Sequence, residues 1–445
     1  MIKFAPVLAT LVSALLVVGS TGVALGDSAG RDSGRRADDA GRGFHGVAFV
    51  VAWNRELLHI VQIPGAQPAT IHQTRSYALL HAAIYDAVVS ITRNGRPYLF
   101  SVDAPAGARP DAAAAAAGHA TLAALYPAMK PALDRLLADQ LALIPDGQAR
   151  RQGIEVGDNV ASLLLAARAD DGSAAIPAPF VAGSQPGDYR STPPNLPAPV
   201  FSDWGNVRPF VLQNGAQFRP APPPALTSAA YARALNEVKS LGQDTSATRT
   251  ADQTLIGRFW APPIWNTWNA IAEEAALAHH TNLVRTATIF AALNLSFADS
   301  AIAMYDAKYH YQLWRPITAV HLADTDGNSA TIGDPNWTPL AVTAADPSYP
   351  GAHSTISAAG AAVLSAFFGD RDEIQVSSPA VPRAVRTFDS YSDVATEAGL
   401  NRIFAGQHTR IDHVAGLHLG NDVARFVLRE SGLGHLGPDG SDDRP

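Results

Sequence analysis

Two cationic side chains near one end of a predicted helix are the first group in this sequence that could do chemistry. The segment KYHYQLWRP places Lys308 and Arg315 seven residues apart. Because seven residues are close to two turns of an α-helix, both cations are expected to project from one face of that helix. The alternative is a solvated basic face, since cations are favoured near the C-terminus of any helix.

A second group lies in the segment PSYPGAHST, which is a turn that opens directly into a helix of small residues. Gly351 and Ala352 are expected to present free backbone N–H groups at the helix start, a favourable place for an anion. His353 would then lie beside that anion. The alternative is that His353 caps an ordinary helix.

The third segment, GLNRIFAGQHTRIDH, crowds arginine, histidine and aspartate side chains around a glycine. Gly406 permits a sharp bend of the backbone. A helix that starts near Thr409 would place His408 at its mouth, with Asp412 within reach of the imidazole ring. An aspartate in that place fixes the tautomer of the ring.

Two other interpretations of the third segment stay open. Arg402 and Asp412 could form a structural ion pair around an interior His408. Alternatively, His408, Asp412 and His413 are residue types that bind zinc, which would indicate a zinc hydrolase. The zinc interpretation leaves the cations unexplained, because positive side chains beside a divalent metal are electrostatically unfavourable.

Taken together, the residues singled out in the three segments offer three cations, two histidines, one carboxylate and a set of N–H donors. This is the set of groups that a tightly bound tetrahedral oxyanion requires. In such a site Arg402 would clamp the equatorial oxygens while His408 approaches the central atom along an axis.

The three segments also resemble the signature motifs of a known superfamily, the vanadium-dependent haloperoxidases together with the type 2 phosphatidic acid phosphatases. The spacing K-x6-RP followed by R-x5-H-x3-D is specific to that pattern. The resemblance extends to WNRELL, LLHAAIYDAV and PNWTPL, and so covers about residues 44–430. The sequence is most similar to the soluble, exported bacterial branch of haloperoxidases.

The resemblance implies a role for each residue of the motifs in a site that binds vanadate. His408 would be the axial ligand of vanadium and His353 the acid–base group. The equatorial oxygens would be neutralised by the three cations and by the helix start, that is by Lys308, Arg315, Arg402, Gly351 and Ala352. Hydrogen peroxide would then oxidise a halide with no redox-active side chain, since the metal acts as a Lewis acid.

The phosphatase members of the superfamily imply an alternative use of the same pocket. Phosphate from a phosphomonoester would replace vanadate, and His408 would be the nucleophile that forms a phosphohistidine. Asp412 would orient His408, and His353 would protonate the leaving alcohol.

Three positions depart from the usual pattern of the superfamily. Gly351 stands where a serine is usual, which removes one donor worth on the order of 1 kcal/mol. Asn401 replaces another serine and can still donate. Asp346 stands where many haloperoxidases have an aromatic residue or histidine, and an acid there would repel a halide.

The elements that must position these residues are predicted to be helices, because apolar residues recur at three- and four-residue spacing through most of the chain. The predicted helices cover residues 47–63, 70–91, 111–125, 130–143, 147–169, 227–241, 265–280, 281–314, 353–368, 390–405 and 410–430.

The segment 172–226, which connects two predicted helices, is rich in proline and glycine. It is expected to be an ordered loop. It is expected to shape either an entrance to the site or the contact of a homodimer. The sequence predicts one all-α domain over residues 44–435, with the motifs in 305–430. Two packed helical bundles are the alternative organisation.

Both ends of the chain are expected to lie outside this domain. Lys3 precedes an apolar run and a small-residue tripeptide, which indicates a secretory signal over residues 1–26 and an extracellular protein. Residues 27–43 lack large apolar side chains and are expected to form a flexible leader. Residues 436–445 are expected to form a tail.

The composition of the 445-residue chain excludes several classes of function. Its formal net charge is -7 and 16% of its residues are charged, so no broad basic face is expected for a nucleic acid. The absence of cysteine excludes disulfides and thiolate chemistry. No apolar run after the predicted signal reaches membrane length, so no integral membrane domain is expected.

Overall fold

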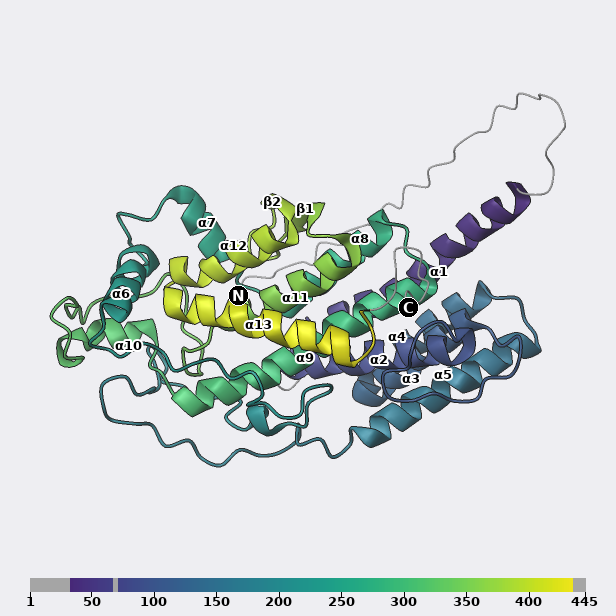
Figure 1. The fold of residues 1–445 in the computed structure, drawn as a ribbon, viewed down its shortest axis with the longest axis horizontal. Helices are drawn as coiled ribbons and strands as arrows, with labels where there is room; N and C mark the ends of the chain where they lie inside the picture. The colour runs from purple at the N-terminus through teal and green to yellow at the C-terminus, as the bar shows by residue number, and fades with distance from the viewer. Residues whose placement is uncertain (1–32, 67–70, 435–445) are drawn as a thin grey trace, which may run out of the picture. The chain divides into compact units, whose positions relative to one another are not determined.

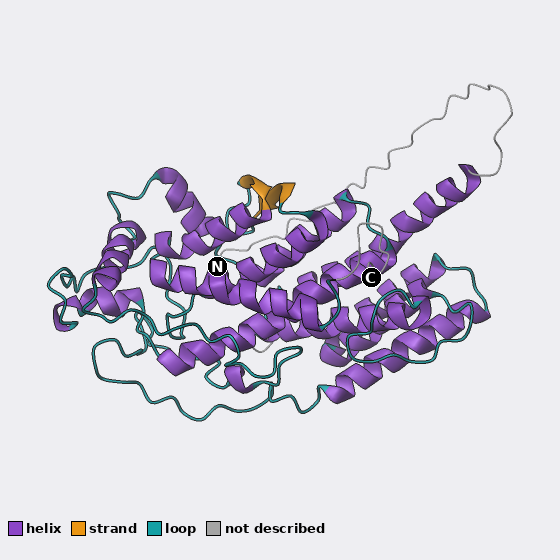
Figure 2. Ribbon diagram, in the orientation of Figure 1, coloured by secondary structure: helices purple, strands orange, loops and turns teal. Residues whose placement is uncertain are grey.

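The computed structural model describes the backbone of residues 33–66 and 71–434, and side chains from residue 46 onward. The described residues form thirteen α-helices and one two-stranded hairpin, which confirms the predicted all-α class (Figures 1 and 2).

The chain divides into two units, Met1–Gly41 and Arg42–Pro445, and the second contains all helices but the first part of α1. The predicted signal at residues 1–26 and tail at 436–445 lie outside the described residues. The first described helix begins at Ser33, within the segment predicted as a leader.

All predicted helical segments overlap a helix of the structure. The helices are α1 (Ser33–Ile60), α2 (His72–Thr92), α3 (Pro110–Leu125), α4 (Lys130–Ala142), α5 (Gln148–Ala167), α6 (Ala229–Gly242), α7 (Ala251–Phe259), α8 (Ile264–Ala278), α9 (Leu283–Tyr311), α10 (Pro316–His321), α11 (Ala352–Phe368), α12 (Tyr391–Phe404) and α13 (Arg410–Glu430). The strands are β1 (Arg371–Ser377) and β2 (Val385–Ser390).

The first half of the described chain packs α2, α3, α4 and α5 together, and α2 also packs on α9. The run of alanines at 112–117 is fully buried and lets α5 approach α3 closely. A Cβ at Gly157 would lie 2.3 Å from the carbonyl oxygen of Ala113, so only glycine fits there. Small residues thus set the spacing of these helices.

The second half is built around α9, α11 and α13, which pack on one another, with α12 against α11 (Figure 1). The contact of α11 with α13 is so close that a Cβ at Gly420 would lie 1.9 Å from the carbonyl oxygen of Thr355. This tight contact fixes the start of α11 beside the start of α13. The second and third motifs are therefore brought together by helix packing.

Helix α9 is long, but polar side chains such as Asn294 and Asp299 interrupt its apolar residues, so it has no unbroken apolar run of membrane length. It has 29 residues, its most apolar window has a mean hydropathy of 1.4, and all of that window is buried inside the protein. By length and composition alone it is the one helix among the described residues that could cross a membrane. Its complete burial is what a core helix of a folded domain shows.

The hairpin β1–β2 and the helices α7 and α10 were not predicted from the sequence. The helices have only 9 and 6 residues, too few for an apolar period to be recognised. In β1 only Ile374 and Val376 are buried, so alternation of apolar residues is too brief to indicate a strand.

The segment 172–226 is an irregular loop, as predicted, with one short 3-10 turn at Trp204–Asn206. Trp204 and Phe210 are buried, and Phe218 packs against the core. Asp299 on α9 accepts hydrogen bonds from the backbone N–H groups of residues 210, 211 and 212 and so fixes the loop on that helix.

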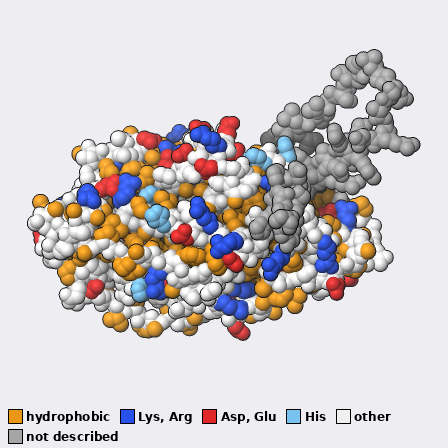
Figure 3. All heavy atoms as spheres, viewed as in Figure 1, with side chains coloured by type: hydrophobic (Ala, Val, Ile, Leu, Met, Phe, Trp, Pro, Cys, Tyr) orange, Lys and Arg blue, Asp and Glu red, His pale blue; other side chains and the backbone are white. Residues whose placement is uncertain are grey.

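On the face of the molecule shown in Figure 3, Lys and Arg side chains are dispersed among hydrophobic and uncharged atoms. Positive charge is therefore not gathered into one area of the described residues on this face, which agrees with the low content of charged residues.

Candidate functional site

Lys308 and Arg315 meet in the structure, but not by projecting from one helix. Helix α9 ends at Tyr311, Gln312 has a left-handed backbone with φ 48°, and Arg315 is the N-cap of α10. The helix restarts rather than continues because Pro316 disfavours a helical conformation in the residue before it. The expectation of one shared helical face is wrong, and a turn of the chain brings the cations together instead.

Asp346, in the loop before α11, is the meeting point of these two cations. One of its carboxylate oxygens lies 3.0 Å from Lys308 Nζ and 2.6 Å from Arg315 Nη2. All three side chains are buried. Burial by itself would raise the pKa of Asp346, but the two cations outweigh burial and lower the pKa to about 2. Asp346 is therefore ionised at any neutral pH.

His408 has a defined tautomer. Arg315 Nη1 lies 3.1 Å from His408 Nε2, and because a guanidinium only donates, this ring nitrogen must accept. The proton is then on Nδ1, which lies 3.4 Å from a carboxylate oxygen of Asp412. Burial and the charges of Arg315, Lys308 and Arg402 lower the pKa of His408 well below its usual value. The ring is neutral and presents a lone pair toward the cations.

Asp412 orients His408 from the first turn of α13, whose N-cap is Thr409 as predicted. Its carboxylate accepts hydrogen bonds from the Thr409 N–H at 2.7 Å and from Ser348 Oγ at 2.8 Å. Burial raises the pKa of Asp412, and these two donors oppose the rise. The alternative ion pair of Asp412 with Arg402 is not formed among the described residues, because Asp412 is held by Thr409 and Ser348 instead.

Arg402, in the last turn of α12, is a cation without a carboxylate partner among the described residues. Its Nε is buried and has no hydrogen-bond acceptor. It is electrostatically coupled to Arg315, Asp346 and His353, which places it in the same cluster. Burial and the repulsion from Arg315 lower the pKa of Arg402 to about 9. A half-buried cation whose Nε is unpaired is unfavourable, so this position fits a bound anion.

His353 is the second residue of α11 and donates from Nε2 to the backbone carbonyl of Trp260, at 2.9 Å. Burial and the charge of Arg402 lower the pKa of His353 well below its usual value, although the Trp260 carbonyl opposes this. Since Nε2 carries the proton, Nδ1 of the neutral ring is free to accept one.

Gly351 does not offer a free N–H group, contrary to the expectation from the sequence. Its N–H donates to the backbone carbonyl of Asp412 at 2.9 Å, because the tight packing of α11 on α13 brings these groups together. A Cβ at this position would lie 3.2 Å from the same carbonyl oxygen, so a serine here would be crowded. Ala352 opens α11, and its N–H belongs to the first turn, which has no intrahelical acceptor.

The zinc interpretation does not fit the geometry. His413 Nδ1 lies 2.9 Å from Ser354 Oγ, and a Cβ at Gly399 would lie 2.3 Å from the same ring nitrogen, so His413 is packed between α11 and α12. No group of three or more His, Cys, Asp or Glu side chains among the described residues could hold a metal ion.

Three groups of the cluster were not predicted as parts of it. The hydroxyl of Ser348 contacts both Asp412 and His408 Nδ1, and the carbonyls of Trp260 and Gln407 accept from His353 and Arg315. Ser348 lies in the second motif, but its type alone does not indicate where its hydroxyl points. Backbone carbonyls leave no signal in a sequence at all.

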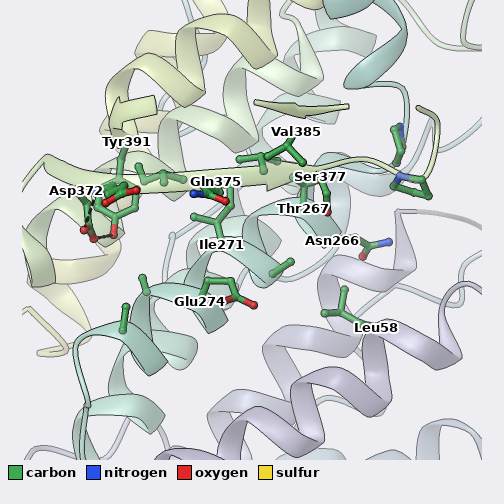
Figure 4. Close-up of a pocket in the computed structure, with 18 of the residues that line it drawn as sticks. Leu58, Asn266, Thr267, Ile271, Glu274, Asp372, Gln375, Ser377, Val385 and Tyr391 are labelled. Carbon is green, nitrogen blue, oxygen red and sulfur yellow. Dashed lines mark hydrogen bonds between the residues drawn. The ribbon is translucent and has the colours of Figure 1, made fainter. Parts of the chain in front are cut away.

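A separate groove of about 740 Å³ lies between α8 and β1 and contains none of the predicted site residues (Figure 4). Its walls include Ile271 and Glu274 of α8 and Gln375 of β1, with Tyr391 at one end. Pro262 in its wall belongs to the segment that follows Trp260, whose carbonyl fixes His353.

Comparisons with known proteins agree with this architecture. Residues 288–431, which hold α9 to α13, match the family of the VCPO second helical-bundle domain. Vanadium chloroperoxidase from Curvularia inaequalis is 24% identical in a match that covers 38% of this chain and 38% of the length of that relative.

Solved structures of two bacterial proteins cover most of the chain. A vanadium-dependent iodoperoxidase has a TM-score of 0.72 and 25% identity, covering 86% of this chain and 95% of its own. A holo-type vanadium-dependent chloroperoxidase shares the fold, with a TM-score of 0.65 and 15% identity over 84% of this chain and 96% of its own. The sequence match over residues 288–431 and the shared fold thus support the vanadium haloperoxidase superfamily, as the three motifs predict.

Proposed function

We propose that this protein is a vanadium haloperoxidase-like enzyme, which binds vanadate and uses hydrogen peroxide to oxidise a halide. The observation that carries the proposal is the pairing of two groups. Arg402 is a half-buried cation with a buried Nε and no acidic partner among the described residues, and His408 presents an Nε2 lone pair among the cations. Together they would suit a small oxyanion whose oxygens are held by the cations and whose central atom is held by one nitrogen.

In this proposal each group of the cluster holds or prepares the oxyanion. Arg402, Arg315 and Lys308 would neutralise its oxygens, and the Ala352 N–H would donate to one of them. His408 Nε2 would hold the central atom, and Asp412 with Ser348 keeps the proton on Nδ1. Bound vanadate supplies a Lewis-acidic metal at which hydrogen peroxide is activated for oxidation of a halide.

His353 is the proton acceptor of the proposed site. Its Nε2–H is held by the Trp260 carbonyl, so a proton from a bound substrate would be taken at Nδ1. The lowered pKa of His353 keeps the ring neutral and able to accept at neutral pH. This state suits the deprotonation of hydrogen peroxide better than the protonation of a leaving group.

The second candidate function is hydrolysis of a phosphomonoester, and the buried carboxylate of Asp346 favours it. A negative charge beside the two cations disfavours the approach of a halide. In this reaction His408 Nε2 forms a bond to phosphorus as the ester P–O bond breaks, and protonated His353 gives its proton to the departing alkoxide. Water then breaks the P–N bond and releases phosphate.

A side-by-side assay is expected to separate the two functions. Purified protein given orthovanadate, hydrogen peroxide and bromide is expected to brominate a phenolic dye, and added phosphate is expected to compete with vanadate and lower the rate. Hydrolysis of p-nitrophenyl phosphate that vanadate inhibits, with no bromination under any loading, would move the assignment to the phosphatase. Protein without added vanadate is the control for halogenation.

The affinity for an oxyanion is expected to fall as the pH rises through about 8. Burial lowers the pKa of Lys308 to about 8, against the opposing effect of Asp346. The ammonium is thus fully present below this pH and is lost above it, and each lost cation weakens anion binding by up to about tenfold per pH unit. Tungstate keeps its double charge in this range, so its calorimetric titration reports the protein alone.

The control for this pH dependence is Lys308→Arg, whose guanidinium does not titrate near pH 8. In this variant the affinity for tungstate is expected to stay constant through pH 8 to pH 9, because a guanidinium keeps its charge there. A tungstate affinity that stays constant through pH 8 to pH 9 in the unchanged protein would exclude Lys308 from the anion site.

A further inference from the structure

The proposed oxyanion site already contains an anion that belongs to the chain. The carboxylate of Asp346 lies 3.0 Å from Lys308 Nζ and 2.6 Å from Arg315 Nη2. Two of the three cations are thus neutralised by the protein itself, and Arg402 alone has no carboxylate partner among the described residues. A guest anion must therefore share or take over contacts that Asp346 makes.

We propose that Asp346 is a specificity-determining residue, which competes with an incoming oxyanion for Lys308 and Arg315 and thereby makes the site select its guest by charge. This inference rests on the proposed function, because it concerns the same oxyanion site. The carboxylate of Asp346 repels a guest in proportion to the charge of that guest, so a doubly charged anion loses more affinity to Asp346 than a singly charged anion does.

The cations would stay in place without the charge of Asp346, because main-chain carbonyls hold them. Lys308 Nζ donates to the carbonyls of Pro347 and Ser348. Arg315 donates from Nε to the backbone carbonyl of Asp346 at 2.7 Å and from Nη1 to that of Gln407 at 2.9 Å. The side chain of Asp346 therefore sets the charge of the site rather than its shape.

A displaced carboxylate has a donor available nearby. The Tyr305 hydroxyl lies 3.4 Å from the second carboxylate oxygen of Asp346. Burial and the charge of Asp346 raise the pKa of Tyr305 well above its usual value, so this hydroxyl keeps its proton. Asp346 can thus yield Lys308 and Arg315 to a guest by a rotation of its side chain alone, while its backbone stays bound to Arg315.

The test compares two tetrahedral anions of different charge, tungstate with two charges and perrhenate with one. Calorimetric titration gives their dissociation constants for the unchanged protein, Asp346→Asn and the charge-retaining Asp346→Glu. Because Coulomb energy scales with the charge of the guest, Asp346→Asn is expected to bind perrhenate about tenfold more tightly and tungstate about a hundredfold. Asp346→Glu is expected to bind both anions as weakly as the unchanged protein.

A matched control lies just after the end of α5. Asp171 is also buried and pairs with two arginines, at 2.7 Å from Arg75 Nε and 3.0 Å from Arg168 Nη2. Asp171→Asn removes the same charge from the same kind of environment, outside the oxyanion site. It is expected to leave both dissociation constants unchanged.

The outcomes separate this inference from the proposed function. Equal gains for the two anions in Asp346→Asn would indicate an effect on packing and overturn the role in charge selection, and so would weaker binding. If the unchanged protein binds tungstate and Asp346→Asn binds it no more tightly, the inference fails and the oxyanion site stands. If neither protein binds either anion, both fail.

Discussion

His408→Ala is expected to abolish oxyanion-dependent activity, with a loss of roughly three orders of magnitude or more in kcat/KM. In both candidate reactions the Nε2 lone pair of His408 would make the one bond to the central atom, and Arg315 and Asp412 fix the tautomer that presents this lone pair. The measurement is kcat/KM in the bromination and phosphomonoester assays, together with a calorimetric titration of orthovanadate.

The matched control is His413→Asn on the same helix. His413 is buried against Ser354 and contacts none of the three cations, so the variant is expected to keep most of its activity. If His408→Ala and His413→Asn lose equal amounts of kcat/KM and added zinc restores both, the result would support the zinc hydrolase interpretation. Retained activity in His408→Ala would remove the proposed axial ligand and nucleophile from the mechanism.

Arg402→Met is expected to change stability and anion binding in opposite directions. The guanidinium of Arg402 is desolvated without a carboxylate partner among the described residues, so an apolar side chain of similar length is expected to stabilise the protein by about 1 kcal/mol or more. The same change removes the cation that is free to bind a guest. The affinity for tungstate is expected to fall by roughly a factor of 100 to 1,000.

Thermal unfolding with and without tungstate measures both effects in one experiment. Tungstate is expected to raise the Tm of the unchanged protein, because it binds only the folded state, and to leave the Tm of Arg402→Met unchanged. The control is Arg315→Met, which leaves Asp346 with one cation and is expected to cost about 3 to 5 kcal/mol of stability. A comparable loss of stability in Arg402→Met would show that Arg402 has a structural partner.

The sequence is a good predictor of which residues form the cluster. Lys308, Arg315, His353, Arg402 and His408 are coupled by contacts or electrostatic interactions in the structure, as the three motifs predict. The long helices were also predicted, because their apolar periodicity extends over several turns. Motif spacing and periodicity are both local properties that a single sequence records.

The geometry within the cluster was harder to predict, because it depends on contacts between distant segments. Nothing in the spacing of Lys308 and Arg315 shows that the helix ends at Tyr311 and that another begins after Arg315. The N–H of Gly351 donates to the backbone carbonyl of Asp412 in α13. This contact depends on how α11 packs against α13, which the sequence does not show. The partners of Asp346 likewise come from two other segments.

The missing counter-charge of Arg402 has a consequence for how the protein must be handled. A cation that no carboxylate among the described residues compensates recruits whatever suitable ion the solvent supplies. Protein that is purified in phosphate or sulfate buffer is expected to carry the buffer anion at Arg402 into each assay, where it competes with vanadate. Chloride or acetate buffers leave this position open to exchange. The anions in the purification buffers, and not only the purity of the protein, therefore determine how much vanadate must be added to fill the site.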